Sequence, residues 1–168
     1  SGPVYLGDRE YFKSVIESKT VVTGIYQVSR VLQVPTVVFA APVLGSQDSV
    51  HAVAFVSLEL RWLNDMASRM NVPAGASLLV LDRQGVTLTR VPDPEKWVGR
   101  KVADFCKPQR PDCMKGEGYI TSAWPDGVDR LYGYKSLQDP GDATALTVLY
   151  GIRSEEHTSE LQSLSHLV

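Results

Sequence analysis

The fold of this chain is decided by LLVLDRQG at residues 78–85, an apolar run that ends in a polar turn and a glycine. Apolar and β-branched residues in so short a run predict a strand, and the return segment VTLTR at 86–90 completes a hairpin around the turn. Since strand-forming segments already fill much of residues 20–60, this hairpin is predicted to open a second sheet.

Three segments upstream of the hairpin predict the strands of the first sheet. They are residues 20–28, 34–44 and 50–60, all rich in β-branched and aromatic residues. The connections are short, as in the turn GSQD at 45–48. Strands joined in this way predict an antiparallel meander.

Two helices are predicted beside these strands. Asp8 is the expected N-cap of a helix that ends near Ser18. The second helix is predicted over residues 61–71, before the break VPAG at 72–75. Its expected apolar side consists of Trp62, Leu63, Met66 and Met70.

The chain after the hairpin is predicted to complete the second sheet. A short helix is expected near residues 101–105, followed by strands at 118–124, 128–137 and 143–152. The turn PDG at 125–127 separates the first two of these strands. The predicted fold class is therefore α+β, with two antiparallel sheets in tandem, of which the first lacks an opening hairpin and is expected to be truncated.

Composition and charge disfavour several classes of protein. Hydrophobic residues make up 43% of the 168 residues, as in ordinary globular proteins, and no apolar run approaches the roughly 20 residues of a membrane-spanning helix. The formal net charge of −2 gives no reason to expect a nucleic acid or an anionic membrane as partner. Because the chain opens on Ser1 without an initiator methionine, we expect a fragment of a longer protein.

The chain has two cysteines, Cys106 and Cys113. Their spacing does not match a CxxC redox motif, and one cysteine pair without a nearby histidine is a poor zinc site. Two prolines between them predict a constrained loop, which favours a local disulfide over two free thiols. A disulfide would imply an oxidising compartment.

The polar segment RSEEHTSELQS at 153–163 departs from the β-rich pattern, which stops at Ile152. It resembles the conceptual translation of a sequencing-library adapter, and the alternative is a natural linker helix. We expect residues 153–168 to be non-native or disordered, and we assign no chemistry to His157 and His166.

Five segments, in their order and spacing, resemble those of the double Cache domains, PAS-like extracytoplasmic sensors of bacterial receptors. They are DREYF at 8–12, VAFVSLEL at 53–60, LVLDRQG at 79–85, PDPEKWVGR at 92–100 and DGVDRLYGY at 126–134. The resemblance implies two PAS-like modules. Residues 1–74 would be the C-terminal part of the membrane-distal module, and residues 75–152 the membrane-proximal module.

The resemblance also implies a setting for the chain. The parent would be anchored in the inner membrane with this part in the periplasm, and its output would be a histidine kinase, a diguanylate cyclase or a chemoreceptor signalling domain. The expected partner is a small carboxylate or amino acid, no cofactor is expected, and homodimerisation is left open.

The candidate ligand site of the first module combines a cation with aromatic walls. Arg9 can grip a carboxylate through two parallel hydrogen bonds, and Tyr11 and Phe12 are candidate walls. Tyr26 is expected to face the same cavity, and Glu59 is a candidate partner for an ammonium group. The alternatives are structural: Arg9 fixes the helix start, Tyr11 and Phe12 fill the core, Tyr26 lies on the outer face of the sheet, and Glu59 ends a strand in solvent.

A second cavity lined by aromatic residues is predicted in the second module. Its candidates are Trp97, Tyr119, Trp124, Tyr132 and Tyr134. For Trp97 we favour packing of the Pro-rich loop against the sheet. For Arg100 and Arg130 we favour exposure to solvent or pairing with aspartates.

The leading functional hypothesis is a sensor module whose ligand shifts a two-state equilibrium. The alternative is a non-binding spacer or dimerisation module of the same kind of receptor. An enzyme is not expected, because the sequence has no GxSxG elbow, no glycine-rich phosphate loop and no HExxH motif. His51, the one histidine outside the tail, lies in an apolar segment and is more typical of a strand edge than of a catalytic base.

Overall fold

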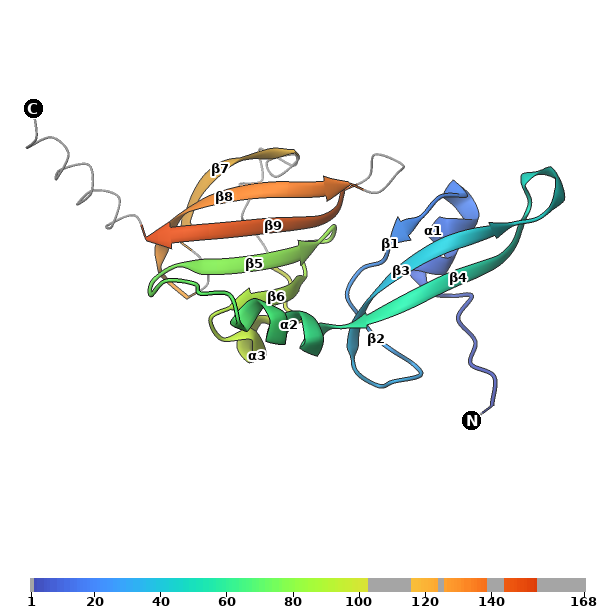
Figure 1. The fold of residues 1–168 in the computed structure, drawn as a ribbon, viewed down its shortest axis with the longest axis horizontal. Coiled ribbons are helices and arrows are strands. Elements are labelled where there is room, and N and C mark those ends of the chain that lie inside the picture. Colours follow the sequence, from blue (N-terminus) through green and yellow to red (C-terminus); the bar gives the residue numbers. More distant parts are fainter. Residues whose placement is uncertain (1, 103–115, 124–125, 139–143, 154–168) are drawn as a thin grey trace, which may run out of the picture.

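The computed structural model describes residues 2–102, 116–123, 126–138 and 144–153. The chain folds into two antiparallel sheets that follow one another along the sequence (Figure 1). The predicted disulfide of Cys106 and Cys113, the candidate Trp124 and the tail from residue 154 onward lie outside the described residues.

The first sheet is built around its third strand. Its strands are β1 (Val22–Thr23), β2 (Gln27–Val28), β3 (Pro35–Leu44) and β4 (Val50–Glu59), and a short 3-10 turn, η1 (Ser46–Asp48), joins the last two. β3 pairs antiparallel with each of the other three strands, which confirms the predicted antiparallel arrangement.

The strand predicted at residues 20–28 is interrupted, and the hydrogen bonds of the backbone explain why. The amide of Gly24 donates to the carbonyl oxygen of Val38 at 2.6 Å, and a side chain at Gly24 would crowd that oxygen. Two residues later, the amide of Tyr26 leaves the ladder and donates to the carboxylate of Asp82 at 2.8 Å. The chain therefore turns toward the second sheet between β1 and β2.

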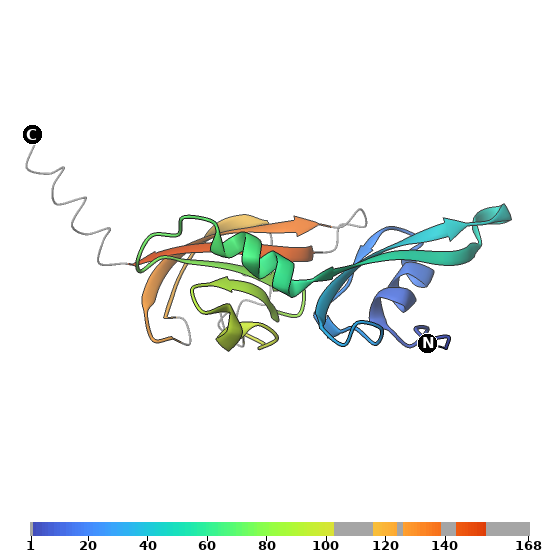
Figure 2. The same ribbon diagram turned by 60° about the horizontal axis from the view of Figure 1, so that its bottom comes forward.

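Helix α1 (Glu10–Ser18) covers one face of the first sheet (Figure 2). Tyr11 and Val15 on this helix pack against buried residues of β1 and β3. The N-cap predicted at Asp8 is wrong: Arg9 occupies the N-cap position, and no side chain caps the helix. The Asp8 carboxylate instead pairs with Arg30, a charge partner that local sequence does not reveal.

Helix α2 (Leu60–Ser68) joins the two sheets. The predicted apolar side is wrong for Trp62, Met66 and Met70, which are 56%, 41% and 52% exposed, whereas Leu60 and Ala67 are buried. Its fourth member, Leu63, is half-buried and packs with Leu60. Both faces of this short helix carry apolar residues at helical spacing, so periodicity alone cannot choose between them. The buried face carries Leu60 and Ala67, and Leu60 packs with Val37 and Leu88.

The second sheet contains strands β5 (Ser77–Asp82), β6 (Thr87–Val91), β7 (Glu117–Ala123), β8 (Asp129–Gln138) and β9 (Thr144–Arg153), in the order β6-β5-β9-β8-β7. All five were predicted to within one or two residues at each end. The helix expected near residues 101–105 is not found at its start, because Lys101 forms an isolated β-bridge with Val86. The helix of this region is α3 (Pro94–Trp97), which begins where proline is favoured at a first turn.

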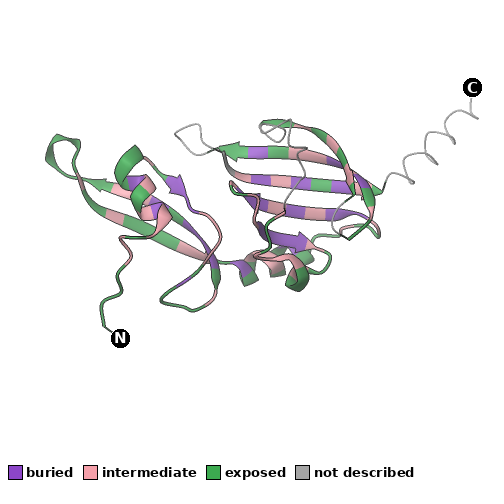
Figure 3. Ribbon diagram, turned by 180° about the vertical axis from the view of Figure 1, so that it is seen from behind, coloured by how far each residue is buried: buried purple, intermediate pink, exposed green. Residues whose placement is uncertain are grey.

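The two sheets share an apolar core at their junction. Val37 of β3, Leu60 of α2 and Leu88 of β6 are at most 1% exposed and pack together. A separate cluster fills the inner face of the second sheet, where buried and exposed residues alternate along the strands (Figure 3). Each sheet thus has its own core, and a third core holds them together.

Candidate ligand-binding site

Charged side chains gather at the start of α1. The two guanidinium nitrogens of Arg30 donate to the two carboxylate oxygens of Asp8 at 2.7 and 2.6 Å, and one of them also donates to the carbonyl oxygen of Tyr5 at 2.8 Å. The hydrogen bonds from Arg30 lower the pKa of the Asp8 carboxyl, against an opposing effect of burial. Both side chains are well exposed, so we expect this ion pair to orient the chain more than to stabilise it.

Arg9 lies beside this ion pair and is half-buried. Its Nη2 donates to the carbonyl oxygen of Val28 at 3.1 Å, which ties the start of α1 to the end of β2. The other N–H donors of its guanidinium have no hydrogen-bond partner among the described residues. A planar guanidinium held at one corner in this way can still bind a carboxylate.

The two predicted aromatic walls take part in the core beneath Arg9. Tyr11 is 3% exposed and packs against Phe55 with ring centroids 5.7 Å apart, while Phe12 is half-buried at the edge of the same cluster. Burial raises the pKa of the Tyr11 hydroxyl, and the positive charges of Arg9 and Arg30 oppose the increase. The hydroxyl of Tyr11 thus lies within the electrostatic reach of both guanidiniums.

The structure does not bring Tyr26 or Glu59 next to Arg9, Tyr11 and Phe12. The ring of Tyr26 packs into the junction core, and its hydroxyl lies so close to Gly99 that a Cβ atom there would be 2.7 Å away. Glu59 is exposed, at the N-cap position of α2, without a side-chain capping bond. Of the five predicted residues, Arg9, Tyr11 and Phe12 lie together.

Sequence reasoning missed Arg30 as a member of this group. It lies in the loop between β2 and β3, far from Asp8 along the chain, and only the fold of the sheet brings the two side chains together. Sequence alone gives no signal for this pair, because Arg30 and Asp8 are 22 residues apart.

A second charged cluster lies on the inner face of the second sheet. Arg90 and Arg130 are 1% and 5% exposed, and both pair with Asp126. Although burial alone would raise the pKa of the Asp126 carboxyl, hydrogen bonds from Arg130, the Val128 amide and Arg90 hold it below its usual value. The prediction that Arg130 pairs with an aspartate is confirmed.

Two of the aromatic residues predicted to line a second cavity, Trp97 and Tyr132, lie next to this cluster. The guanidinium of Arg90 lies 4.5 Å from the ring centre of Trp97, and that of the exposed Arg100 lies at 6.0 Å. Tyr132 is fully buried, and Trp97 and Tyr134 pack against the same core. The indole of Trp97 therefore packs the Pro-rich loop onto the sheet through a cation–π contact.

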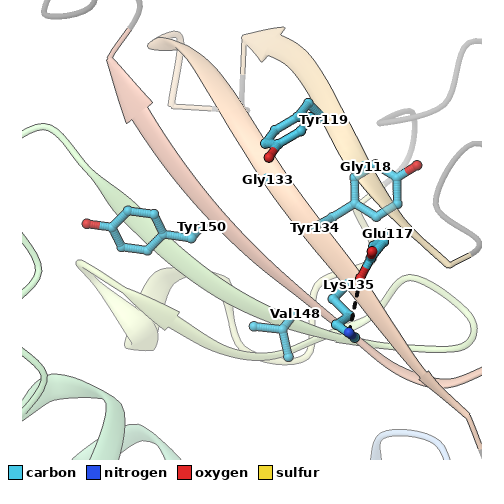
Figure 4. A pocket seen from close by; sticks show the side chains of 8 residues that line it. All are labelled: Glu117, Gly118, Tyr119, Gly133, Tyr134, Lys135, Val148 and Tyr150. Atoms are coloured by element: carbon cyan, nitrogen blue, oxygen red, sulfur yellow. Dashed lines mark hydrogen bonds and ion pairs between the residues drawn. The ribbon is translucent and has the colours of Figure 1, made fainter.

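Tyr119 is separate from the other predicted aromatic residues, since it is 82% exposed on the opposite face of the sheet. There it borders an open groove of about 660 Å³ (Figure 4). The groove is lined by Glu117, Gly118, Tyr119, Gly133, Tyr134, Lys135, Val148 and Tyr150. Lys135 and Glu117, two of these lining residues, form an exposed ion pair at 3.0 Å.

The described residues hold no group of three or more His, Cys, Asp or Glu side chains placed to bind a metal ion. Within the same ranges, no helix has the length and apolar character that crossing a bilayer requires.

Comparison with solved structures identifies the fold. The extracellular domain of the histidine kinase candidate mmHK1S-Z3 superimposes on 98% of this chain with a TM-score of 0.79 and 16% identity. That of the candidate rpHK1S-Z16 superimposes on 95% with a TM-score of 0.71 and 19% identity. The chain has the fold of these extracellular domains.

A third neighbour with this fold is the ligand-binding domain of the amino acid chemoreceptor PctB of Pseudomonas aeruginosa PAO1, solved in complex with L-Arg. It superimposes on 100% of the chain with a TM-score of 0.67 and 11% identity. The chain spans 60%, 66% and 64% of the lengths of these three domains. No protein-family model and no curated protein sequence matches the chain.

Proposed function

We propose that this chain is part of the extracytoplasmic sensor domain of a transmembrane receptor, on the periplasmic side of an inner membrane. The observation that carries the proposal is the match of nearly the whole chain to extracellular domains of histidine kinase candidates. The proposed division places residues 1–74 in a membrane-distal module and residues 75–152 in a membrane-proximal module. Catalysis, where the parent has it, would belong to a different domain.

The proposed ligand is a small carboxylate or an amino acid, bound at the start of α1. The half-buried guanidinium of Arg9 supports this class of ligand, because most of its donors have no partner among the described residues. The neighbouring Arg30 adds positive charge, and Asp8 offers a carboxylate to an ammonium group. One end of this cluster therefore suits the carboxylate of an amino acid and the other suits its amine.

The contributions of the aromatic and acidic residues follow from their positions. Tyr11 and Phe12 are proposed as the apolar floor beneath Arg9. Tyr26 and Glu59 stay predicted contacts, and they are the weakest ones, because Tyr26 packs in the junction core and Glu59 points to solvent at the end of β4.

A second candidate function is a spacer or dimerisation module without a ligand. The observation that favours it is the burial of Tyr11, which leaves its ring in the core rather than in an open cavity. The separation of Tyr26 and Glu59 from Arg9 favours it too.

A thermal-shift screen of the chain with amino acids and short organic acids distinguishes the two functions. A ligand that binds only the folded state raises the melting temperature, by an amount equivalent to about 2.7 kcal/mol at a concentration of 100 Kd. The sensor proposal expects a saturable rise with at least one compound of this class. If no compound shifts the melting temperature at millimolar concentration, the spacer function is favoured.

A further inference from the structure

The turn between β5 and β6 reaches from the second sheet into the first. Asp82, which is 3% exposed, accepts three backbone hydrogen bonds. Its Oδ1 accepts from the amides of Gln84 and Val86 at 2.8 and 2.9 Å, which shapes the turn itself. Its Oδ2 accepts from the amide of Tyr26 at 2.8 Å, which belongs to the first sheet. One carboxylate thus fixes the turn and the other sheet at the same time.

The next residue, Arg83, makes two more contacts with the first sheet and its helix. One guanidinium nitrogen donates to the carbonyl oxygen of Thr23, at the end of β1. The other donates to Oε1 of Glu10, in the first turn of α1. The same oxygen of Glu10 accepts from the hydroxyl of Ser14 at 2.9 Å, so the carboxylate is also held by its own helix.

In the sequence, Glu10 lies between Arg9 and Tyr11, two residues of the proposed site. Arg9, its neighbour on one side, is the proposed anchor for the carboxylate, and Tyr11 on the other side is part of the floor. Because the three residues lie in the same first turn, a shift of that turn moves Glu10 together with Arg9. The Glu10–Arg83 ion pair then passes the shift to the β5–β6 turn.

We propose that Asp82 and Arg83 form the element that couples the start of α1 to the second sheet, with Arg83 as its positioning residue. The biological meaning of this coupling rests on the proposed sensor function, whereas the contacts themselves do not. Both side chains of the Glu10–Arg83 pair are partly shielded, at 38% and 23% exposed, so the pair is stronger than a fully solvated one. The backbone bonds to Asp82 and Thr23 give it a fixed geometry.

Amide hydrogen exchange followed by NMR tests the coupling without any ligand. Val15→Ala loosens α1 from the first sheet, since Val15 is fully buried there. The readout is the exchange rate of the Gln84 and Val86 amides, which report on Asp82 from the second sheet. We expect Val15→Ala to accelerate the exchange of these two amides in the wild-type background. The acceleration should be about fivefold smaller in the Arg83→Gln background, a difference typical of residues coupled through one ion-pair network.

Two further variants keep the test decisive. Lys135→Gln breaks an exposed ion pair within the second sheet and should leave the effect of Val15→Ala on these amides unchanged. If Arg83→Gln does not give a folded spectrum, Glu10→Gln removes the same ion pair from its other side. Equal acceleration of Gln84 and Val86 in the wild-type and variant backgrounds would overturn the proposal. That result would leave the proposed sensor function standing, because no ligand enters the experiment.

Discussion

The Asp8–Arg30 pair of the first sheet and the Asp126 cluster of the second differ in burial. In the first, Asp8 and Arg30 meet at the surface, with side chains 45% and 39% exposed. In the second, Arg90 and Arg130 are almost fully buried against Asp126. A buried guanidinium requires a partner in a fixed position, whereas an exposed one can exchange its partner for a ligand or for water.

The two sheets also differ in the lengths of their strands. In the first sheet β3 and β4 have ten residues each but β1 and β2 have only two, whereas every strand of the second sheet has five to ten. Short strands offer few ladder hydrogen bonds, so they open more easily. The comparison indicates that the first sheet is the adaptable part of the molecule and the second is its frame.

The largest effect is expected in the core of the frame. Leu149→Ala removes a fully buried side chain that packs with Leu79, Leu81 and Tyr132, and we expect a loss of about 2–5 kcal/mol in the free energy of unfolding. Urea denaturation measures it. The control Leu137→Ala, on a side chain 45% exposed in the same sheet, should change little. Similar losses for both variants would contradict the assignment of the core.

The next effect concerns the buried charges. Asp126→Asn removes the negative charge that neutralises two buried guanidiniums, and we expect a loss of about 3 kcal/mol in the free energy of unfolding. Asp129→Asn, which changes an exposed carboxylate three residues after Asp126, is the matched control. A loss below about 1 kcal/mol for Asp126→Asn would show that the cluster is not a structural part of the frame.

The same cluster predicts how stability depends on pH. The pKa of Asp126 is lowered in the folded state, so its contribution is complete at neutral pH and is lost as the pH falls from about 4 toward the folded pKa. The wild-type melting temperature should therefore drop more steeply below pH 4 than that of Asp126→Asn. Parallel curves for the two proteins would show that Asp126 is not linked to acid unfolding.

The smallest effect on stability is expected at the exposed ion pair of the first sheet. Arg30→Gln should leave the melting temperature nearly unchanged, because both partners face solvent. It should accelerate hydrogen exchange of the Arg9 amide, whose bond to the Leu6 carbonyl oxygen lies in the segment that Arg30 holds. A marked fall in melting temperature would show that the first sheet is as firmly braced as the second.

Much of the fold could be predicted because its signals are local. The strands β3 to β9 are marked by β-branched runs, and the turn after Asp82 by its polar residues and Gly85. The break in the strand at residues 20–28 could not be predicted, because it depends on a hydrogen bond from Tyr26 to Asp82, more than fifty residues away.

The candidate site was predictable only where its members are close in sequence. Arg9, Tyr11 and Phe12 lie in one helical turn, and a single motif finds them. Arg30 pairs with Asp8 from a loop, and Arg83 pairs with Glu10 from the second sheet. Arg90 likewise pairs with Asp126, which is distant in the sequence, on the inner face of the second sheet. The position of Tyr26 in the junction core could not be predicted for the same reason, since strand alternation gives the face of a residue only if the strand continues.

The most direct test of the central claim, that Arg9 anchors a small carboxylate or amino acid at the start of α1, is a calorimetric titration of Arg9→Ala. The probe is the amino acid or organic acid that gives the largest thermal shift with the wild-type chain. We expect Arg9→Ala to weaken its binding at least about 10-fold while the melting temperature without ligand stays close to that of the wild type. Arg61→Ala, which removes an exposed guanidinium from α2, should bind as the wild type does. Unchanged affinity in Arg9→Ala would contradict the account.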